Sequence, residues 1–253
     1  MSTDKILGFD ISSSGRQGDI DQAWAIIEHG EYGKYASCIN PHSTVVSTSD
    51  LEFTESLMSS DILVPDGAGI GLASNILGKN IKERVTGSDL FFGISECANK
   101  KGGIKYFFLG STQTVLDKIS AKLAKDYPGI EVCGIYSPPY KPKFSDEDNA
   151  VMIEMINQTK PDVLWVGMTA PKQEKWIHEN RHKLQVPLSG AIGAVFDFYA
   201  GTVPRSPEWA CRMGLEWLPR LIREPRRLFK RNFISSPLFL FMVFKEKLGF
   251  IKG

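Results

Sequence analysis

Asp66 is the residue whose type and position best suit acid–base chemistry. It follows the apolar run 62–64 and stands in a turn between Pro65 and the glycine-rich stretch 67–71. A carboxylate held there can serve as a general base, although an aspartate that caps the following helix has the same pattern. The glycines do not follow the G-x-G-x-x-G spacing, so the stretch does not indicate a dinucleotide-binding site.

Two other segments of small residues could approach a ligand closely. Gly110 follows the apolar run 104–109 and precedes hydroxyl residues that would begin a helix, whose free amides suit a phosphate or a ribose. A simple capped turn explains the same residues. Asp197 lies among aromatic residues in the segment 190–201, where it could accept a hydrogen bond from a ribose or a base, or serve the fold alone.

A predicted helix after the run 163–166 carries several polar side chains. Pro171 can begin it, which places Lys172 and Gln173 in its first turn, either against a ligand or in solvent. Residues 178–182 read H-E-x-x-H, the pattern of many zinc proteases. Nothing marks out a third ligand, so we interpret this pattern as the polar face of a helix.

The region 201–253 is strongly basic. It contains 11 Lys+Arg against four Glu, whereas residues 1–200 contain 19 Lys+Arg against 25 Asp+Glu. Guanidinium groups match phosphate oxygens, and apolar residues interleave with the cations as in helices that lie on a membrane. We therefore expect an anionic partner; nucleic acid is the weaker alternative, because no recognition motif accompanies the basic residues. Six cations fall within 12 positions: Arg220, Arg223, Arg226, Arg227, Lys230 and Arg231.

The elements that must position these side chains alternate along the chain. Between most of the apolar runs, apolar residues recur every three or four positions, as expected for helices. One such helix is predicted at 112–127, and another at 146–159 with Val151, Met155 and Ile156 on its apolar face. The alternation predicts an α/β fold with a mostly parallel, doubly wound sheet covered by helices on both faces. The apolar runs predicted as strands are 5–9, 36–39, 61–64, 104–109, 130–135, 162–166 and 186–192.

Composition excludes several classes of protein. Of the 253 residues, 42% are hydrophobic and 23% are charged, which is typical of a folded globular domain rather than a disordered chain. The four cysteines lie far apart, so we expect reduced thiols in a cytoplasmic protein and neither a disulfide scaffold nor a zinc ribbon. No signal peptide is evident, and no apolar stretch has the length of a transmembrane helix.

Several motifs, taken together, resemble those of the WecG/TagA/CpsF family of glycosyltransferases. They keep the order of the family and extend over about residues 35 to 232. Each motif alone is unspecific, whereas the set is specific. The motifs are at residues 65–67, 84–90, 170–174, 193–201 and 214–228.

The resemblance implies a fold, an activity and a location. The fold would be a Rossmann-like catalytic body at 1–200, with a basic helical appendage at 201–253 that binds membrane and closes the active site. The activity would be inverting transfer of a sugar from a UDP-sugar to a polyprenyl-diphosphate-linked sugar, specifically undecaprenyl-linked, with no cofactor and no metal. N-acetylmannosamine is the favoured sugar, and UDP-glucose or another hexose donor is the alternative. The enzyme would be peripheral on the inner face of the cell membrane, in surface polysaccharide or teichoic acid synthesis.

The resemblance also carries over individual residues. Asp66 would be the general base, with Arg84 and Gln173 near the reacting groups. Asp197 would contact the nucleoside of the donor; the resemblance adds nothing to Gly110, which is a candidate for the same nucleotide only from its place before a helix. The diphosphate would be neutralised by three residues of the appendage: Arg220, Arg223 and Arg227.

Cys38 departs from the family, because many relatives have threonine two positions before the asparagine that is Asn40 here. A thiol is a weak hydrogen-bond donor, so Asn40 is expected to take over part of the contact with substrate. Two D-x-D spacings, at 19–21 and 146–148, offer a metal-dependent alternative. Both lie where a helix is expected to begin, and acidic residues are favoured there, so we prefer cationic side chains over a metal. The aromatic residues of the appendage leave a homo-oligomer open.

Overall fold

The computed structural model describes residues 2–81, 83–203 and 229–250. Its centre is a six-stranded sheet in which every strand pairs in parallel with its neighbours. The order across the sheet is β4-β3-β8-β7-β5-β6. This confirms the predicted α/β class. The strands are β3 (Lys34–Ile39), β4 (Ile62–Pro65), β5 (Ile104–Gly110), β6 (Ile130–Tyr136), β7 (Val163–Gly167) and β8 (Leu188–Ala191).

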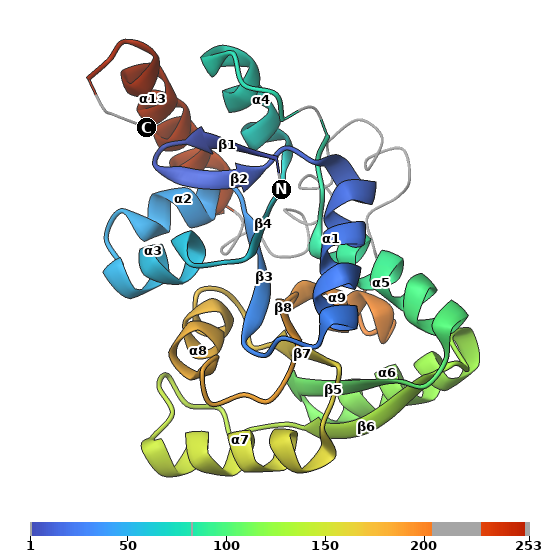
Figure 1. Cartoon of the computed structure of the whole chain (residues 1–253). Coiled ribbons are helices and arrows are strands. Elements are labelled where there is room, and N and C mark those ends of the chain that lie inside the picture. The colour runs from blue at the N-terminus through green and yellow to red at the C-terminus, as the bar shows by residue number, and fades with distance from the viewer. Residues whose placement is uncertain (1, 82, 204–228, 251–253) are drawn as a thin grey trace.

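Helices cover both faces of this sheet, because successive strand residues point to opposite sides. On one face, Tyr106, Phe108 and Trp165 pack against α1 (Gly15–His29), α5 (Gly87–Lys101), α6 (Gln113–Asp126) and α9 (Ala194–Tyr199). On the other, Phe107 and Leu164 pack against α7 (Asp146–Thr159) and α8 (Lys172–Asn180). Figure 1 shows this sandwich around the central strands. The same second face is extended by α2 (Pro41–Ser47), α3 (Leu51–Met58) and α4 (Ala68–Leu77).

The predicted strand at 5–9 is wrong. Leu7 and Gly8 instead form the turn of an antiparallel hairpin between β1 (Thr3–Ile6) and β2 (Phe9–Ser12), which is separate from the main sheet. Both turn residues have positive φ, 49° and 84°, as a type I′ hairpin turn requires. The backbone N–H of Leu7 donates to Glu246 Oε2 at 2.7 Å, which stabilises the turn from outside. An apolar run alone does not reveal such a turn.

Two predicted helices are present, with one error in their faces. The segment 112–127 contains α6, in which Val115, Ile119 and Leu123 are buried as predicted. The segment 146–159 coincides with α7, but Val151 is 49% exposed and Met152 takes the buried position. Periodicity gives the spacing of buried positions along a helix more reliably than it tells which residue of each turn faces the core, so it favours Val151 over Met152.

The segment 229–250 is helical and joins the core. It contains a π-helical turn, η1 (Lys230–Ser235), followed by α13 (Ser236–Lys247). Phe239 and Val243 are buried in a cluster with residues of the β1–β2 hairpin, α3 and α4. Figure 1 shows α13 beside the hairpin and α4. Ser235 Oγ bonds His42 Nδ1 at 2.9 Å, which ties η1 to α2. None of the described helices is long and apolar enough to cross a membrane.

Candidate active site

The sequence-predicted site residues of the body gather at one edge of the sheet. They lie at the carboxyl ends of five adjacent strands, the edge at which open parallel sheets bind ligands. Strands lie about 4.8 Å apart, so the four spacings from β4 to β5 span roughly 19 Å. In the order β4, β3, β8, β7 and β5, the strands are followed by Asp66, by Asn40 with Cys38 at the strand end, by α9 with Asp197, by α8 with Gln173, and by the turn at Gly110.

Asp66 forms an ion pair with Arg84 at the end of β4. Its backbone N–H donates to Ile39 O at 2.8 Å, which continues the pairing of β4 with β3. Val85 N donates to Pro65 O at 3.0 Å and brings Arg84 alongside. The Nε and Nη2 groups of Arg84 both donate to Asp66 Oδ1 at 3.3 Å. The carboxylate is thus oriented by a cation at the strand end.

The alternative reading of Asp66 as a helix cap is wrong. The N-cap residue of α4 is Gly67, with φ 92°, and no side chain caps this helix. A Cβ on Gly67 would meet Pro41 and Asn40 at ordinary contact distance, so the positive φ is what favours glycine there. The carboxylate of Asp66 is therefore directed to Arg84 rather than to the amides of its own helix.

Cys38 lies on β3 and Asn40 directly follows this strand, but the structure gives Asn40 a local role. Its Oδ1 accepts from the backbone N–H groups of His42 and Ser43, both at 3.0 Å, and so caps α2. Any substrate contact of Asn40 has to use the other side of its amide. Burial, together with the nearby Asp66, Glu174 and Asp89 carboxylates, raises the pKa of the Cys38 thiol well above its usual value. The thiol therefore stays protonated, which disfavours it as a nucleophile.

Gly110 ends β5 where no side chain fits. A Cβ there would stand 2.5 Å from Gly167 O, and the residue has φ 112°. Ser111 N donates to the same carbonyl at 2.9 Å, and Thr112 caps α6 through Val115 N at 3.4 Å. The capped turn is therefore present, and close approach of β5 to β7 explains the glycine. A nucleotide contact at Gly110 stays a prediction.

Gln173 and Glu174 are buried in the first turn of α8, rather than in solvent. They are 5% and 3% exposed. Gln173 Oε1 accepts from Gly193 N at 3.2 Å, and Gln173 Nε2 donates to Glu174 Oε1 at 2.9 Å. Burial raises the pKa of Glu174 to about 7, against the opposing effect of the bond from Gln173. Sequence reasoning did not single out Glu174, because glutamate in a first helical turn is common on exposed helices.

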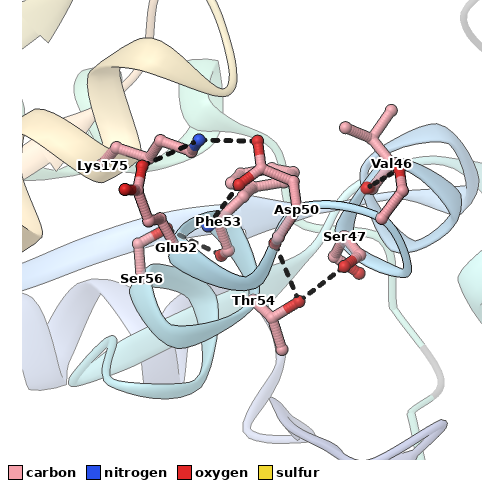
Figure 2. Close-up of polar contacts among 9 residues, drawn as sticks. Val46, Ser47, Asp50, Glu52, Phe53, Thr54, Ser56 and Lys175 are labelled. Carbon is pink, nitrogen blue, oxygen red and sulfur yellow. Dashed lines mark hydrogen bonds and ion pairs between the residues drawn. The ribbon is translucent and has the colours of Figure 1, made fainter.

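Contacts along its length hold α8 in place. Lys175 Nζ lies 2.6 Å from Asp50 Oδ2 and 3.3 Å from Glu52 Oε2 on α3, as Figure 2 shows. Asp50 also caps α3, accepting from Phe53 N at 3.1 Å (Figure 2). One turn further on, His178 Nδ1 lies 3.2 Å from Tyr35 OH on β3. The helix that carries Gln173 is thus fixed to α3 and to the sheet.

The H-E-x-x-H pattern begins on α8 but ends in the turn beyond it, since α8 stops at Asn180, so the pattern is not the face of a single helix. His178 bonds Tyr35, and His182 Nε2 accepts from Arg181 Nε at 3.3 Å. Within the part of the chain that the structure describes, no three His, Cys, Asp or Glu residues form a group that could hold a metal ion. Of the D-x-D aspartates, Asp19 on α1 is buried and accepts from Ser12 on β2. Asp148 accepts from the backbone N–H of Ser145, the N-cap residue of α7, and from Lys141 Nζ.

Two other predicted residues have local partners. Lys172 turns away from the strand ends: its ammonium donates to Lys141 O and stacks on the Phe144 ring. Asp197 Oδ1 accepts from Thr202 Oγ1 at 3.2 Å, a bond that serves the turn after α9. A contact of Asp197 with a nucleoside stays a prediction. The predicted phosphate-binding arginines, namely Arg220, Arg223 and Arg227, lie outside the described residues.

Comparison with known proteins identifies the group to which this architecture is related. Residues 5–253 match the glycosyl transferase WecG/TagA/CpsF family. An N-acetylglucosaminyldiphosphoundecaprenol N-acetyl-β-D-mannosaminyltransferase of Bacillus subtilis is 32% identical over 215 residues, covering 85% of this chain and 80% of the relative. The enzyme of the same name from Bacillus spizizenii is 30% identical with the same coverage. That from Staphylococcus aureus is 26% identical over 208 residues, covering 82% of this chain and 78% of the relative.

Proposed function

The chain is a glycosyltransferase of the WecG/TagA/CpsF family, and from that premise we propose its substrates and mechanism. It transfers N-acetylmannosamine from a UDP-sugar to the N-acetylglucosamine of an undecaprenyl-diphosphate-linked acceptor, in the synthesis of a bacterial surface polymer. The names of its relatives support this substrate pair. The observation that carries the mechanism is the Asp66 carboxylate, which stands at the strand-end edge against Arg84 and does not cap a helix.

Asp66 is the general base in this mechanism. The acceptor hydroxyl oxygen attacks the anomeric carbon of the donor while Asp66 takes its proton. The bond from the anomeric carbon to the UDP oxygen breaks, and UDP leaves with the electron pair. Attack from the face opposite the leaving group inverts the configuration. Arg84 orients the carboxylate, and Arg220, Arg223 and Arg227 neutralise the departing diphosphate without a metal.

The length of the edge supports an extended donor. About 19 Å separate the strand end that carries Asp66 from the one that carries Gly110, too far for one small sugar to touch both. A nucleotide sugar can lie along such an edge, with its nucleoside toward β5 and α9 and its sugar toward β4. In this arrangement Asp197 and Gly110 contact the nucleotide and Asn40 lies beside the sugar. Gln173, whose amide bonds Gly193 after β8, stands between them, near the reacting groups.

We further propose that the outer surface of η1 and α13 contacts the inner face of the cell membrane. The described part of this segment exposes apolar side chains while Lys245 and Lys247 lie close by, a composition suited to an anionic lipid surface. The exposed residues include Phe229, Phe233, Ile234, Leu238, Phe241 and Phe244. Contact between copies of the chain would use the same surface.

Liposome sedimentation distinguishes these two uses of the surface. Replacement of Phe241 and Phe244 by serine leaves the buried Phe239 and Val243 in the core, so the variant should fold. We expect it to stay in the supernatant while the wild type sediments with anionic vesicles. Equal sedimentation of both would refute the membrane contact. A lower oligomeric state of the variant in ultracentrifugation, with equal sedimentation, would assign the surface to self-association.

The experiment that tests the activity is a UDP-release assay. Purified protein is supplied with a short-chain lipid-diphosphate-N-acetylglucosamine acceptor and a panel of UDP-sugars, with and without EDTA. We expect release with UDP-N-acetylmannosamine and no effect of EDTA. Release with UDP-glucose alone would correct the donor, and loss of activity in EDTA would overturn the metal-independent step. Protein that binds no UDP and releases none would overturn the proposed function.

A further inference from the structure

The side chain of Gln173 connects two turns at the strand-end edge. It lies in the first turn of α8, the helix that follows β7, and its Oε1 accepts from the backbone N–H of Gly193, which lies between β8 and α9. A Cβ at Gly193 would stand 2.6 Å from that oxygen, so the close approach requires glycine. The amide is thus held between two neighbouring strand ends.

The orientation of this amide follows from its two partners. A backbone N–H can only donate, so the side of Gln173 that faces Gly193 must be the oxygen. Its nitrogen then faces Glu174, whose Oε1 accepts at 2.9 Å. These bonds use one amide hydrogen and one lone pair of Gln173, and leave one further donor for a ligand.

Burial of the Glu174 carboxyl group at this position is unfavourable in free energy. It is 3% exposed, and its Oε2 has no hydrogen-bond partner among the residues that the structure describes. Burying a carboxyl group with an unsatisfied oxygen costs free energy that an apolar side chain of the same length would not cost. The bond from Gln173 offsets part of this cost, together with a bond from the backbone of Glu174 itself.

We propose that Glu174 is a positioning residue, which holds the Gln173 amide against Gly193 and so fixes the donor group that Gln173 offers to the substrate. This inference rests on the proposed function, because it assumes that Gln173 lies near the reacting groups. Glu174 does not touch the substrate itself. It acts from beneath the edge, through its neighbour.

Four variants test this role by their kcat and KM values. Glu174→Met keeps the length of the side chain without an acceptor, and should lower kcat by about 10- to 100-fold, as expected when a substrate-orienting group is misplaced. Glu174→Gln keeps an acceptor oxygen for Gln173, and should restore kcat to within about threefold of the wild type. Gln173→Ala should lose as much as Glu174→Met. The double variant should lose no more than Gln173→Ala, because the two residues act as one unit.

Two outcomes would overturn the proposal. One is a kcat of Glu174→Met within about threefold of the wild type, and the other is losses that multiply in the double variant. Melting temperatures measured alongside show that each variant is folded. A wild-type kcat in Gln173→Ala, with transfer lost in Asp66→Asn, would overturn this inference and leave the proposed function standing.

A second measurement needs no activity. Hydrogen exchange of the Gly193 amide reports the bond to Gln173 directly. We expect about tenfold faster exchange of this amide in Glu174→Met than in the wild type, and wild-type exchange in Glu174→Gln. Unchanged exchange in Glu174→Met would refute the positioning role, even if the transferase assay found no substrate.

Discussion

The two halves of the strand-end edge differ in solvent exposure and in the kind of contact that holds their side chains. At β4, Asp66 and Arg84 form an ion pair whose side chains are 24% and 33% exposed, so solvent reaches both charges. At β7 and β8, Gln173 and Glu174 are almost fully buried and joined by short-range hydrogen bonds. An accessible charge can exchange protons and meet a substrate, whereas a buried network keeps one geometry. We therefore infer that the half with Asp66 carries out proton transfer and that the half with Gln173 orients the substrate.

Asp66→Asn should have the largest effect on activity, because it removes the base from the exposed half of the edge. The amide has nearly the shape of the carboxylate but cannot take a proton, so kcat should fall by about 10²- to 10⁴-fold. UDP affinity and melting temperature should stay close to those of the wild type. Isothermal titration and thermal unfolding supply these controls. Near-normal turnover in this variant would remove the general-base assignment.

Arg84→Lys should have the next largest effect. Lysine keeps the positive charge but lacks the two nitrogens that reach Asp66 Oδ1 together, so the carboxylate loses its fixed orientation. We expect kcat to fall by about tenfold, and Arg84→Ala to fall further. Steady-state kinetics of both variants provide the measurement. Equal loss in the two variants would mean that charge alone provides nothing at this position.

Glu174→Gln should change how the free energy of unfolding depends on pH, which reports on the buried half of the edge. The pKa of Glu174 is raised from 4.5 to about 7, so its contribution to stability is present below pH 4.5 and is lost as the pH rises through 7. The variant lacks this loss. Its stability relative to the wild type should therefore rise between pH 5 and pH 8, by about 2–3 kcal/mol.

Thermal unfolding of both proteins at the two pH values measures this change. The pKa of Asp19 is also raised, to about 6, but Asp19 is present in both proteins and its effect cancels in the difference. The Cys38 thiol remains protonated throughout, because its pKa lies well above the usual value. A difference in stability that does not change with pH would show that Glu174 does not titrate in this window.

Lys175→Met should have the smallest effect. The ion pairs of Lys175 with Asp50 and Glu52 are partly exposed, so their loss should cost less than about 1 kcal/mol. The other contacts of α8 remain, and kcat should stay within about twofold of the wild type. Glu52→Gln serves as the matched control, since it removes the more exposed partner. A large loss of kcat would mean that the α3–α8 contact positions the site.

Much of the site could be predicted because strand ends are visible in the sequence. Asp66, Gly110 and Gln173 each follow a short apolar run, and parallel strands bring such positions to one edge. The sequence does not show which polar side chains form hydrogen bonds with neighbouring groups of the folded chain instead of facing a ligand. Asn40 caps α2, for example, and Lys172 turns to the loop that contains Phe144.

Burial and distant pairing were the parts that could not be predicted. Glu174 has the sequence position of an exposed residue in a first helical turn, and only the packing of α8 buries it. The run 5–9 was interpreted as one strand, because the turn at Leu7 depends on a partner 239 residues away. Periodicity likewise placed Val151 inside, where Met152 lies. Each miss concerns a contact that local pattern does not encode.

The packing of the β1–β2 hairpin against α13 also affects when this core can be completed during synthesis. Ile6, Phe9 and Ile11 share their core with Phe239 and Val243, so residues made early on the ribosome depend on residues made late. At 5–20 residues per second, the interval is roughly 10–50 s. During synthesis the hairpin can pack on α3, β4 and α4 once these are made, but its core stays incomplete until α13 emerges.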